Sequence, residues 1–468
     1  MRNKETVTTM RDSSLRTQDK AFSGTGVDWD ALRRRMRGKL LRPGDPGFDD
    51  ARKLFNTLTD DHIPAAVAQC ATVNDVREAV SAARTRIPVA ARGGGHSYVG
   101  YSAPPGGLVI DMRRLSTVDV HKDGTASIGS GAVLEDVYRK LAAAKRCLPA
   151  GSCFSVGIAG LALGGGLGVL QRSLGLTCDR LVAAEIVTAD AAVRTATADQ
   201  DPDLFWALRG GGGGNLGVVT KFTFSTVPAP ALTVFVLKFP AGEVRTRKVL
   251  TAWQQWISAA SRKMWASLII DSGDTPKCRV AGCFVGRGSA CNPLLDDLVS
   301  RSGVTPDTRK VLERDYFQAM KFLAGGTGRE TFVASSRILD APVADPKALV
   351  ALLTGRKGIA LILDPLGGAV ADLGVHDTAF PYRKAFATAQ IYAGTTASNQ
   401  AKARRNVAEV VAKMGAQGIG KGHVNYIDPA LPDWPNAYYG SNLNKLRTVA
   451  HTYDPDKVFD FAQGLTRV

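Results

Sequence analysis

Hydrophobic spacing alternates between the helical and the strand period through the first half of the chain. Apolar residues recur at helical spacing from 73 to 83, directly after Thr72 and with Asp75 three residues on, which predicts a capped helix. A second apolar stripe predicts a helix over 133–144. Short apolar runs predict strands over 87–91, 108–111, 118–120, 126–129, 185–188, 193–195 and 217–225. This alternation indicates an α+β fold.

From residue 232 the pattern changes. Apolar runs over 232–237 and 279–285 predict strands of a second sheet, and a long amphipathic stretch predicts a helix over 397–414 that ends at Gly415. A chain of 468 residues is long enough for two domains. We expect a tail with a lead-in helix over 29–41 within residues 1–45, a first domain over 46–230 and a second domain that begins at 231.

The chain is basic, with 59 Lys and Arg against 43 Asp and Glu, a net charge of +16. Nucleic-acid binding, binding of an anionic ligand and a plain basic surface would each produce this balance. The sequence contains no recognisable nucleic-acid module and no basic run with interleaved aromatic residues. We therefore favour a basic surface and expect no nucleic-acid partner.

The seven cysteines form no C-x-x-C pair, which favours a reducing compartment. Residues 1–25 are polar and lack the apolar segment of a secretory signal, so we expect an unstructured tail and a cytoplasmic protein, with a removed leader as the alternative. The sequence has no apolar run long enough to span a membrane and no metal-ligand spacing, so we expect neither a membrane nor a metal partner.

Three glycine-rich segments carry the candidate chemistry. The first, RGGGHS over 92–97, exposes backbone N–H groups that can form a nest for phosphate, with added charge from Arg92. His96 places a nucleophilic imidazole on this loop, and the alternative is a turn with a solvated histidine. The third segment has five consecutive glycines, Gly210 to Gly214, before an apolar strand, which favours close approach of the backbone to a ligand.

The second segment, 149–168, repeats G-x-x-G spacing but has no G-x-G-x-x-G after a strand. A nicotinamide-binding Rossmann motif is therefore weakly supported, and a loop along a dinucleotide pyrophosphate is the alternative. Cys153 lies in this segment, and a small buried thiol is its structural interpretation.

Taken with a C-terminal run that includes HVNYID over 423–428 and AYYGSN over 437–442, these segments resemble one family. The chain resembles the FAD-linked oxidases of the vanillyl-alcohol oxidase or p-cresol methylhydroxylase fold, and is similar to their berberine bridge enzyme and oligosaccharide oxidase branch. The resemblance covers about residue 50 to the end. It implies an FAD-binding domain over 46–230 completed by 421–468, a substrate domain between them with one antiparallel sheet backed by helices, and FAD in the crevice.

The resemblance also implies residue roles. His96 would bond the flavin 8α carbon and Cys153 the flavin C6, so that FAD is held by two covalent links. A valine at position 156 accompanies oxidases in the family, which favours oxygen as the electron acceptor. The residues expected at the cofactor are Arg92, Gly93, Gly94, Gly95, His96, Ser97, Gly151, Ser152, Cys153, Val156, Gly157, Gly160, Val219, Tyr439 and Asn442.

By the same resemblance Tyr426 would remove the substrate proton, and its pKa near 10 would have to be lowered by neighbours. The plant branch uses a glutamate on a strand that aligns with 388–392, where this chain has Gln390. Tyr392 and Tyr382 are second candidates for the cleft, and a core aromatic is the alternative for each tyrosine. The remaining histidines singled out are expected to be structural or superficial: His62, His121, His376 and His451.

The expected function is an FAD-dependent oxidase with bicovalent flavin. It would oxidise an alcohol, hemiacetal or amine carbon of a bulky small molecule, a sugar or a natural-product intermediate of secondary metabolism or antibiotic biosynthesis. Oxygen would accept the electrons and hydrogen peroxide would leave. A dehydrogenase or oxidative cyclase of the same family is one alternative, and a catalytically inactive ligand-binding scaffold is another.

Overall fold

The computed structural model describes residues 26–468, so the expected tail lies outside the described residues. The N-terminal part of the first domain builds a four-stranded sheet of order β1-β2-β4-β3. Strand β1 pairs antiparallel with β2, whereas β4 runs parallel to both β2 and β3. The elements of this part are α2 (Trp29–Arg35), β1 (Lys39–Leu41), α3 (Phe48–Arg52), η1 (Thr57–Thr59), β2 (Ala66–Gln69), α4 (Val73–Ala83), β3 (Val89–Arg92) and β4 (Leu108–Asp111).

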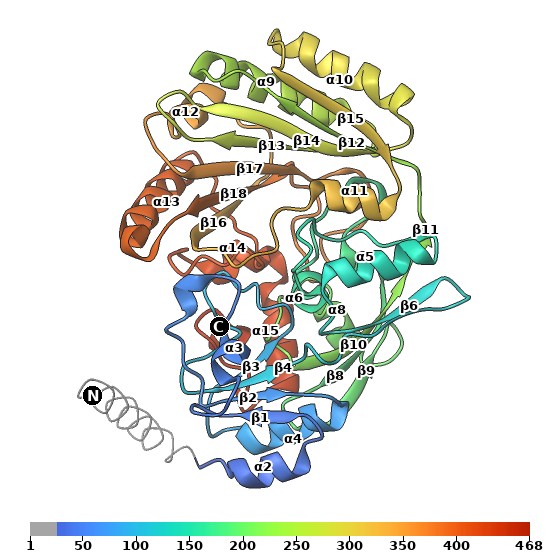
Figure 1. The fold of residues 1–468 in the computed structure, drawn as a ribbon, viewed down its shortest axis with the longest axis vertical. Helices are drawn as coiled ribbons and strands as arrows, with labels where there is room; N and C mark the ends of the chain where they lie inside the picture. Colours follow the sequence, from blue (N-terminus) through green and yellow to red (C-terminus); the bar gives the residue numbers. More distant parts are fainter. Residues whose placement is uncertain (1–25) are drawn as a thin grey trace, which may run out of the picture.

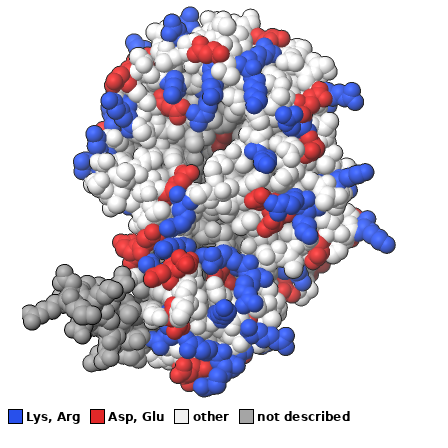
Figure 2. Space-filling model, in the orientation of Figure 1, with Lys and Arg blue, Asp and Glu red and all other residues white. Residues whose placement is uncertain are grey.

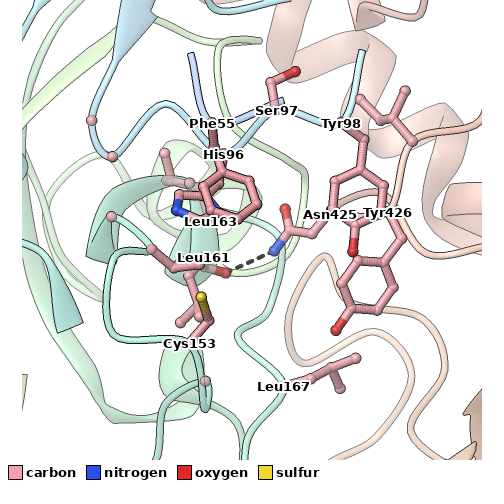
Figure 3. Close-up of a pocket in the computed structure, with 18 of the residues that line it drawn as sticks. Phe55, His96, Ser97, Tyr98, Cys153, Leu161, Leu163, Leu167, Asn425 and Tyr426 are labelled. Atoms are coloured by element: carbon pink, nitrogen blue, oxygen red, sulfur yellow. Dashed lines mark hydrogen bonds between the residues drawn. The ribbon is translucent and has the colours of Figure 1, made fainter. Parts of the chain in front are cut away.

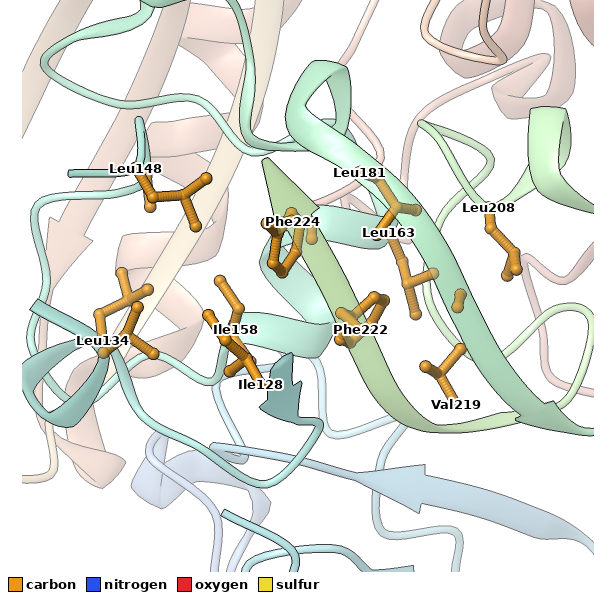
Figure 4. Close-up of a cluster of buried hydrophobic side chains, with 14 of the residues drawn as sticks. Ile128, Leu134, Leu148, Ile158, Leu163, Leu181, Leu208, Val219, Phe222 and Phe224 are labelled. Atoms are coloured by element: carbon orange, nitrogen blue, oxygen red, sulfur yellow. The ribbon is translucent and has the colours of Figure 1, made fainter. Parts of the chain in front are cut away.

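A five-stranded antiparallel sheet of order β5-β6-β10-β8-β9 follows. Phe222 and Phe224 of β10 are fully buried beside Ile128 of β6 and Ile158 of α6, in the core drawn in Figure 4. The elements are β5 (Val118–Val120), β6 (Thr125–Gly129), α5 (Leu134–Ala143), β7 (Arg146–Cys147), α6 (Ile158–Leu163), α7 (Gln171–Leu174), η2 (Thr177–Arg180), β8 (Leu181–Val187), β9 (Val193–Ala196), α8 (Pro202–Ala207), β10 (Val218–Ser225) and β11 (Val227–Pro228).

The inserted part is one seven-stranded antiparallel sheet of order β15-β12-β14-β13-β17-β18-β16. Helices α9, α10, α12 and α13 contribute to the hydrophobic core of this sheet and lie on its outer side in Figure 1. The elements are β12 (Leu232–Lys238), α9 (Glu243–Ala259), β13 (Met264–Asp271), β14 (Lys277–Val285), α10 (Gly288–Ser302), β15 (Thr308–Arg314), α11 (Tyr316–Leu323), β16 (Phe332–Leu339), α12 (Pro346–Ala351), β17 (Ile359–Pro365), η3 (Gly368–Asp372), β18 (Ala387–Gly394), η4 (Ala397–Asn399) and α13 (Gln400–Gly415).

The C-terminal segment returns to the first part of the chain. Val458 and Phe459 pack in the same cluster as β2, β4 and α4, although they are nearly 400 residues away in sequence. The elements are α14 (Trp434–Tyr439), η5 (Gly440–Asn442), α15 (Leu443–Tyr453) and η6 (Leu465–Arg467). The observed architecture is α+β with an inserted antiparallel sheet backed by helices, as the sequence predicts.

Three element bounds differ from expectation. The lead-in helix ends at Arg35, because the backbone is extended at Met36 and the N–H groups of Arg37 and Gly38 donate to Asp75. The chain then pairs as β1 with β2, so the expected helix over 29–41 is partly a strand. Between the expected strands over 217–225 and 232–237 the chain forms a further short strand, β11, which pairs with β7. Helix α13 begins at Gln400 after a short 3₁₀ turn.

Within residues 26–468, none of the helices has the length and apolar character needed to cross a bilayer.

Candidate active site

A cavity of about 670 Å³ lies where the first part of the chain, the seven-stranded sheet and the C-terminal segment meet. This volume is in the range of small-molecule and cofactor pockets. All three glycine-rich segments contribute to its lining, together with β13, β14, β17, β18 and the loop that carries Tyr426. Figure 2 shows a hollow across the middle of the drawn face, with Lys and Arg scattered among Asp and Glu around it.

The first two glycine loops pack against each other through their backbones. A Cβ at Gly94 would lie 2.3 Å from the Gly157 backbone nitrogen, and a Cβ at Gly157 would lie 2.2 Å from the Gly94 nitrogen. Neither position has room for a side chain. Glycine is therefore required here to bring the loop of His96 against the loop of Cys153.

His96 and Cys153 meet at one hydroxyl. Ser155 Oγ lies 3.0 Å from His96 Nε2 and 3.6 Å from Cys153 Sγ. Phe55 stacks on the imidazole with the ring centroids 4.0 Å apart and an interplanar angle of 20°. Figure 3 shows the imidazole and the thiol on the same side of the pocket, with Tyr426 across from them. Two side chains 57 positions apart in sequence thus face one space.

His96 is held as a neutral imidazole. Burial lowers its pKa to about 4, against a smaller opposing contribution from the Ser155 backbone. A neutral imidazole keeps a lone pair on one ring nitrogen, which is the form that acts as a nucleophile.

The loop that carries Tyr426 is fixed by a hydrogen bond of Asn425 and by two aromatic contacts of the tyrosine ring. Asn425 Nδ2 donates to the Leu161 carbonyl oxygen at 3.0 Å, the dashed contact in Figure 3. Tyr98 stacks on the Tyr426 ring at 5.6 Å, and His423 meets its edge at 5.0 Å. These contacts place the tyrosine on the cavity wall.

The electrostatics of Tyr426 differ from expectation. Its pKa is raised rather than lowered, first by burial and then by the negative charge of Asp364. Asp364 lies on β17, lines the same cavity and has its own pKa raised to about 6 by burial. No basic side chain opposes these effects on Tyr426 among the described residues. The neighbours of Tyr426 therefore do not lower its pKa as expected, and the charge that acts on it is that of a carboxyl group.

Of the other two candidate tyrosines, one lines the cavity and one does not. Tyr392 lines the cavity, donates its hydroxyl proton to Glu330 and stacks on Phe332 at 4.7 Å. Tyr382 is buried, donates to the Ala437 carbonyl oxygen and is not among the residues that line the cavity. Gln390 lines the cavity and donates to the Tyr98 hydroxyl.

Three residues expected at the cofactor do not line the cavity. Arg92 is buried outside the lining, where its guanidinium donates to the Ala51 carbonyl oxygen. Tyr439 is buried and donates to the Gly211 carbonyl oxygen at 3.2 Å. Asn442 Nδ2 donates to the carbonyl oxygens of Val375 and Thr378, and Asn442 Oδ1 forms a hydrogen bond with His376 Nδ1. These side chains support the loops around the cavity rather than its lining.

The other expected cofactor residues do line the cavity. They come from the three segments that the sequence singles out: Gly93, Gly94, Gly95, His96, Ser97, Gly151, Ser152, Cys153, Val156, Gly157, Gly160 and Val219. Sequence reasoning missed Phe55, Tyr98, Ser155 and Asp364. Ser155 alone had a signal, since it lies inside the cysteine segment, whereas Asp364 reaches the cavity only through sheet pairing.

The cavity fits FAD. A Cβ at Gly160 would meet nothing within 4 Å, so the loop floor is open to a bound group. The Ser130 hydroxyl is buried, belongs to a lining residue and has no hydrogen-bond partner within residues 26–468. Such a group is satisfied by a polar ligand. In the same range no three His, Cys, Asp or Glu side chains cluster closely enough to hold a metal ion.

Comparisons with known proteins agree with this geometry. The FAD binding domain model matches residues 64–197, and the berberine and berberine-like model matches residues 422–466. The chain is 32% identical over 447 residues to the uncharacterized FAD-linked oxidoreductase YgaK of Bacillus subtilis, covering 92% of this chain and 97% of that protein. It is 30% identical to the chitooligosaccharide oxidase of Gibberella zeae, covering 86% and 87%.

Among solved structures, glucooligosaccharide oxidase from Acremonium strictum superposes with a TM-score of 0.85 at 26% identity, covering 94% of this chain and 99% of that one. That enzyme holds a 6-S-cysteinyl, 8α-N1-histidyl FAD. The match over nearly the whole length of relatives at 30% identity or more, together with the two domain models, establishes the family. The chain is therefore an FAD-linked oxidoreductase that belongs to the berberine bridge enzyme-like family.

Proposed function

We propose that this protein is an oxidase that holds FAD through two covalent links, at His96 and Cys153, and oxidises an alcohol, hemiacetal or amine carbon of a bulky small molecule. One observation carries the proposal: the imidazole and the thiol lie at the same hydroxyl, facing Tyr426 across one cavity. The division into an FAD-binding unit over 46–230 and 421–468 and a substrate unit over 231–420 is part of it.

Bound FAD supplies the acceptor for a hydride from the substrate carbon. The protein must then remove the proton of the same group. Tyr426 lies on the cavity wall, and Asp364 is close enough to raise the pKa of its phenol. We propose that Tyr426 takes the substrate proton as its own phenolic proton passes to the carboxylate of Asp364. This arrangement removes the need for a free phenolate, which burial disfavours.

Oxygen as the electron acceptor rests on Val156. Its side chain lines the cavity and packs against the core of the five-stranded sheet. A valine at this position accompanies oxidases in the family that the chain resembles. Tyr392, near the cavity rim with Glu330, is proposed to contact the substrate.

A sugar or another polyhydroxylated molecule is the first substrate class to test, because two relatives are named oligosaccharide oxidases. A natural-product intermediate is the second. A panel of oligosaccharides and complex alcohols, scored by hydrogen peroxide release under air, separates an oxidase from a dehydrogenase. Flavin that bleaches without peroxide would indicate a dehydrogenase or cyclase, and flavin that never bleaches would favour a binding scaffold.

Denaturing gel electrophoresis with in-gel flavin fluorescence tests the attachment. We expect the wild type, His96→Ala and Cys153→Ala all to retain fluorescence, because each single variant keeps one link, and the double variant to lose it. The bicovalent proposal fails if the double variant stays fluorescent, or if either single variant is as dark as the double.

A further inference from the structure

Ser155 stands between the two side chains that are proposed to bond the flavin. Its hydroxyl is 3.0 Å from His96 Nε2 and 3.6 Å from Cys153 Sγ. A serine hydroxyl has one proton to donate and lone pairs to accept. It can therefore accept a hydrogen bond from the imidazole and donate one to the sulfur at the same time.

This arrangement decides which imidazole nitrogen reacts. Because burial keeps the ring neutral, one nitrogen carries a proton and the other a lone pair. A hydrogen bond from Nε2–H to Ser155 Oγ places the proton on Nε2 and leaves the lone pair on Nδ1. Phe55 stacks on the ring and restricts its rotation, so the orientation of Nδ1 is also fixed.

Toward the thiol, the same hydroxyl is a hydrogen-bond donor. With its acceptor side used by the imidazole, its proton is directed to Cys153 Sγ. Sulfur is a weak hydrogen-bond acceptor, so this contact holds the Cys153 side chain beside the imidazole. Cys153 is partly exposed, whereas the other six cysteines are buried, so it is also the accessible thiol.

We propose that Ser155 is a positioning residue for covalent flavin attachment: its hydroxyl selects the Nε2–H tautomer of His96 and hydrogen-bonds the sulfur of Cys153. The inference rests on the bicovalent attachment proposed above. Each bond removes one hydrogen from the flavin and one from the protein: the proton leaves Nε2 after Nδ1 of His96 bonds, or leaves the Cys153 thiol. Two electrons and two protons therefore leave for each bond. Dioxygen takes them and becomes hydrogen peroxide.

The test is a time course of attachment in the full-length protein. Protein prepared under riboflavin limitation is incubated with FAD under air, and the flavin bound at each residue is measured by peptide mass spectrometry. Total flavin uptake is measured separately from the absorbance of the native protein. The variants are Ser155→Ala, Ser155→Thr, which keeps a hydroxyl, and Ser127→Ala, which removes the hydroxyl of a surface pair with His121 at 2.9 Å.

We expect Ser155→Ala to take up FAD as the wild type does but to form both bonds about tenfold more slowly, the effect of losing one hydrogen bond. Ser155→Thr should recover most of the rate, and Ser127→Ala should match the wild type.

The inference is overturned if Ser155→Ala attaches flavin at the wild-type rate, if Ser155→Thr is as slow as Ser155→Ala, or if uptake and attachment fall together, which would indicate a structural role. A wild type that takes up FAD and forms no bond at either residue would instead overturn the proposed function, and the inference with it.

Discussion

At the scale of single residues, Tyr426 carries the proposed proton transfer. Tyr426→Phe keeps the stack on Tyr98 but has no hydroxyl to accept a proton. We expect the rate of flavin reduction by substrate to fall by about 10²- to 10⁴-fold, the usual contribution of a general base, with little change in substrate binding. Anaerobic stopped-flow spectroscopy measures both. Reduction at the wild-type rate would remove Tyr426 from the mechanism.

The raised pKa of Asp364 leads us to expect that flavin reduction depends on pH. Its pKa is raised to about 6 by burial, and the carboxylate is the form that accepts a proton. Flavin reduction should therefore be slow below pH 6 and should rise as the pH rises through 6. Asp364→Asn should remove this rise. A flat profile in the wild type between about pH 5 and 7 would exclude Asp364 as the acceptor.

Much of this site could be predicted from the sequence, because three of its parts are contiguous glycine-rich segments whose composition marks them. His96 and Cys153 lie in such segments, Tyr426 lies in the C-terminal motif, and all three do meet at the cavity. Asp364 and Phe55 could not be predicted, since each reaches the cavity only through contacts distant in sequence. Arg92 is expected at the cofactor for its charge, but its guanidinium donates to the Ala51 carbonyl oxygen, a contact distant in sequence that the motif does not reveal.

At the scale of elements, helix α4 begins with the capping box that its sequence predicts. The N–H of Asp75 donates to the Thr72 hydroxyl, and the Asp75 carboxylate accepts from the Thr72 N–H. The same carboxylate accepts from the N–H groups of Arg37, Gly38 and Ala71. One side chain therefore ends α2, sets the start of β1 and begins α4. The sequence indicates the cap but not the contacts with Arg37 and Gly38, which is why it predicts α2 too long.

Replacing this carboxylate should be costly. Asp75→Ala leaves several backbone donors without an acceptor, and we expect a loss of about 2–4 kcal/mol in the free energy of unfolding, measured by urea titration. Asp49→Ala, which removes an exposed carboxylate from α3, is the control and should change little. A loss below about 1 kcal/mol for Asp75→Ala would contradict this role.

The pH dependence of this contribution has a definite sign. Burial raises the pKa of Asp75, but hydrogen bonds from Arg37, Ala71, Gly38 and Thr72 outweigh it, so the folded pKa lies below the usual value. A depressed carboxyl pKa stabilises the fold at pH values above the unfolded pKa, and this is lost as the pH falls through the folded one. The difference between wild type and Asp75→Ala should therefore shrink in acid.

At the scale of the whole molecule, two buried arginines form hydrogen bonds and an ion pair between the first part of the chain and the inserted part. Arg383, between η3 and β18, is fully buried and forms a two-pronged ion pair with Asp179 of η2 at 2.7 and 2.8 Å. Arg172 of α7 donates to four backbone carbonyl oxygens of the inserted part. These contacts fix the position of the inserted part relative to the first part of the chain, and both parts line the cavity.

Arg383→Met should leave Asp179 buried without its partner and lower the free energy of unfolding by about 3–5 kcal/mol. The matched control is Arg262→Met, because Arg262 forms an exposed pair with Asp372 and should contribute less than about 1 kcal/mol. Thermal and urea unfolding measure both variants. Equal losses of unfolding free energy for the two variants would contradict a stabilising role of the Arg383–Asp179 pair between the two parts.

The start of a second sheet could be predicted because the hydrophobic pattern changes near residue 232, and β12 of the seven-stranded sheet begins at Leu232. The contacts between the parts could not, since Arg383 lies in an irregular segment and Asp179 in a short 3₁₀ turn, neither with a periodic signal. The strongly basic composition also proved uninformative about the site, as Figure 2 shows Lys and Arg dispersed among acidic residues.

Peptide mapping of the denatured wild-type protein tests most directly whether His96 and Cys153 hold the same flavin. Proteolysis followed by mass spectrometry should yield one species in which a single FAD joins the peptide that contains His96 to the peptide that contains Cys153. Flavin on only one of these peptides, or released free on denaturation, would contradict the account.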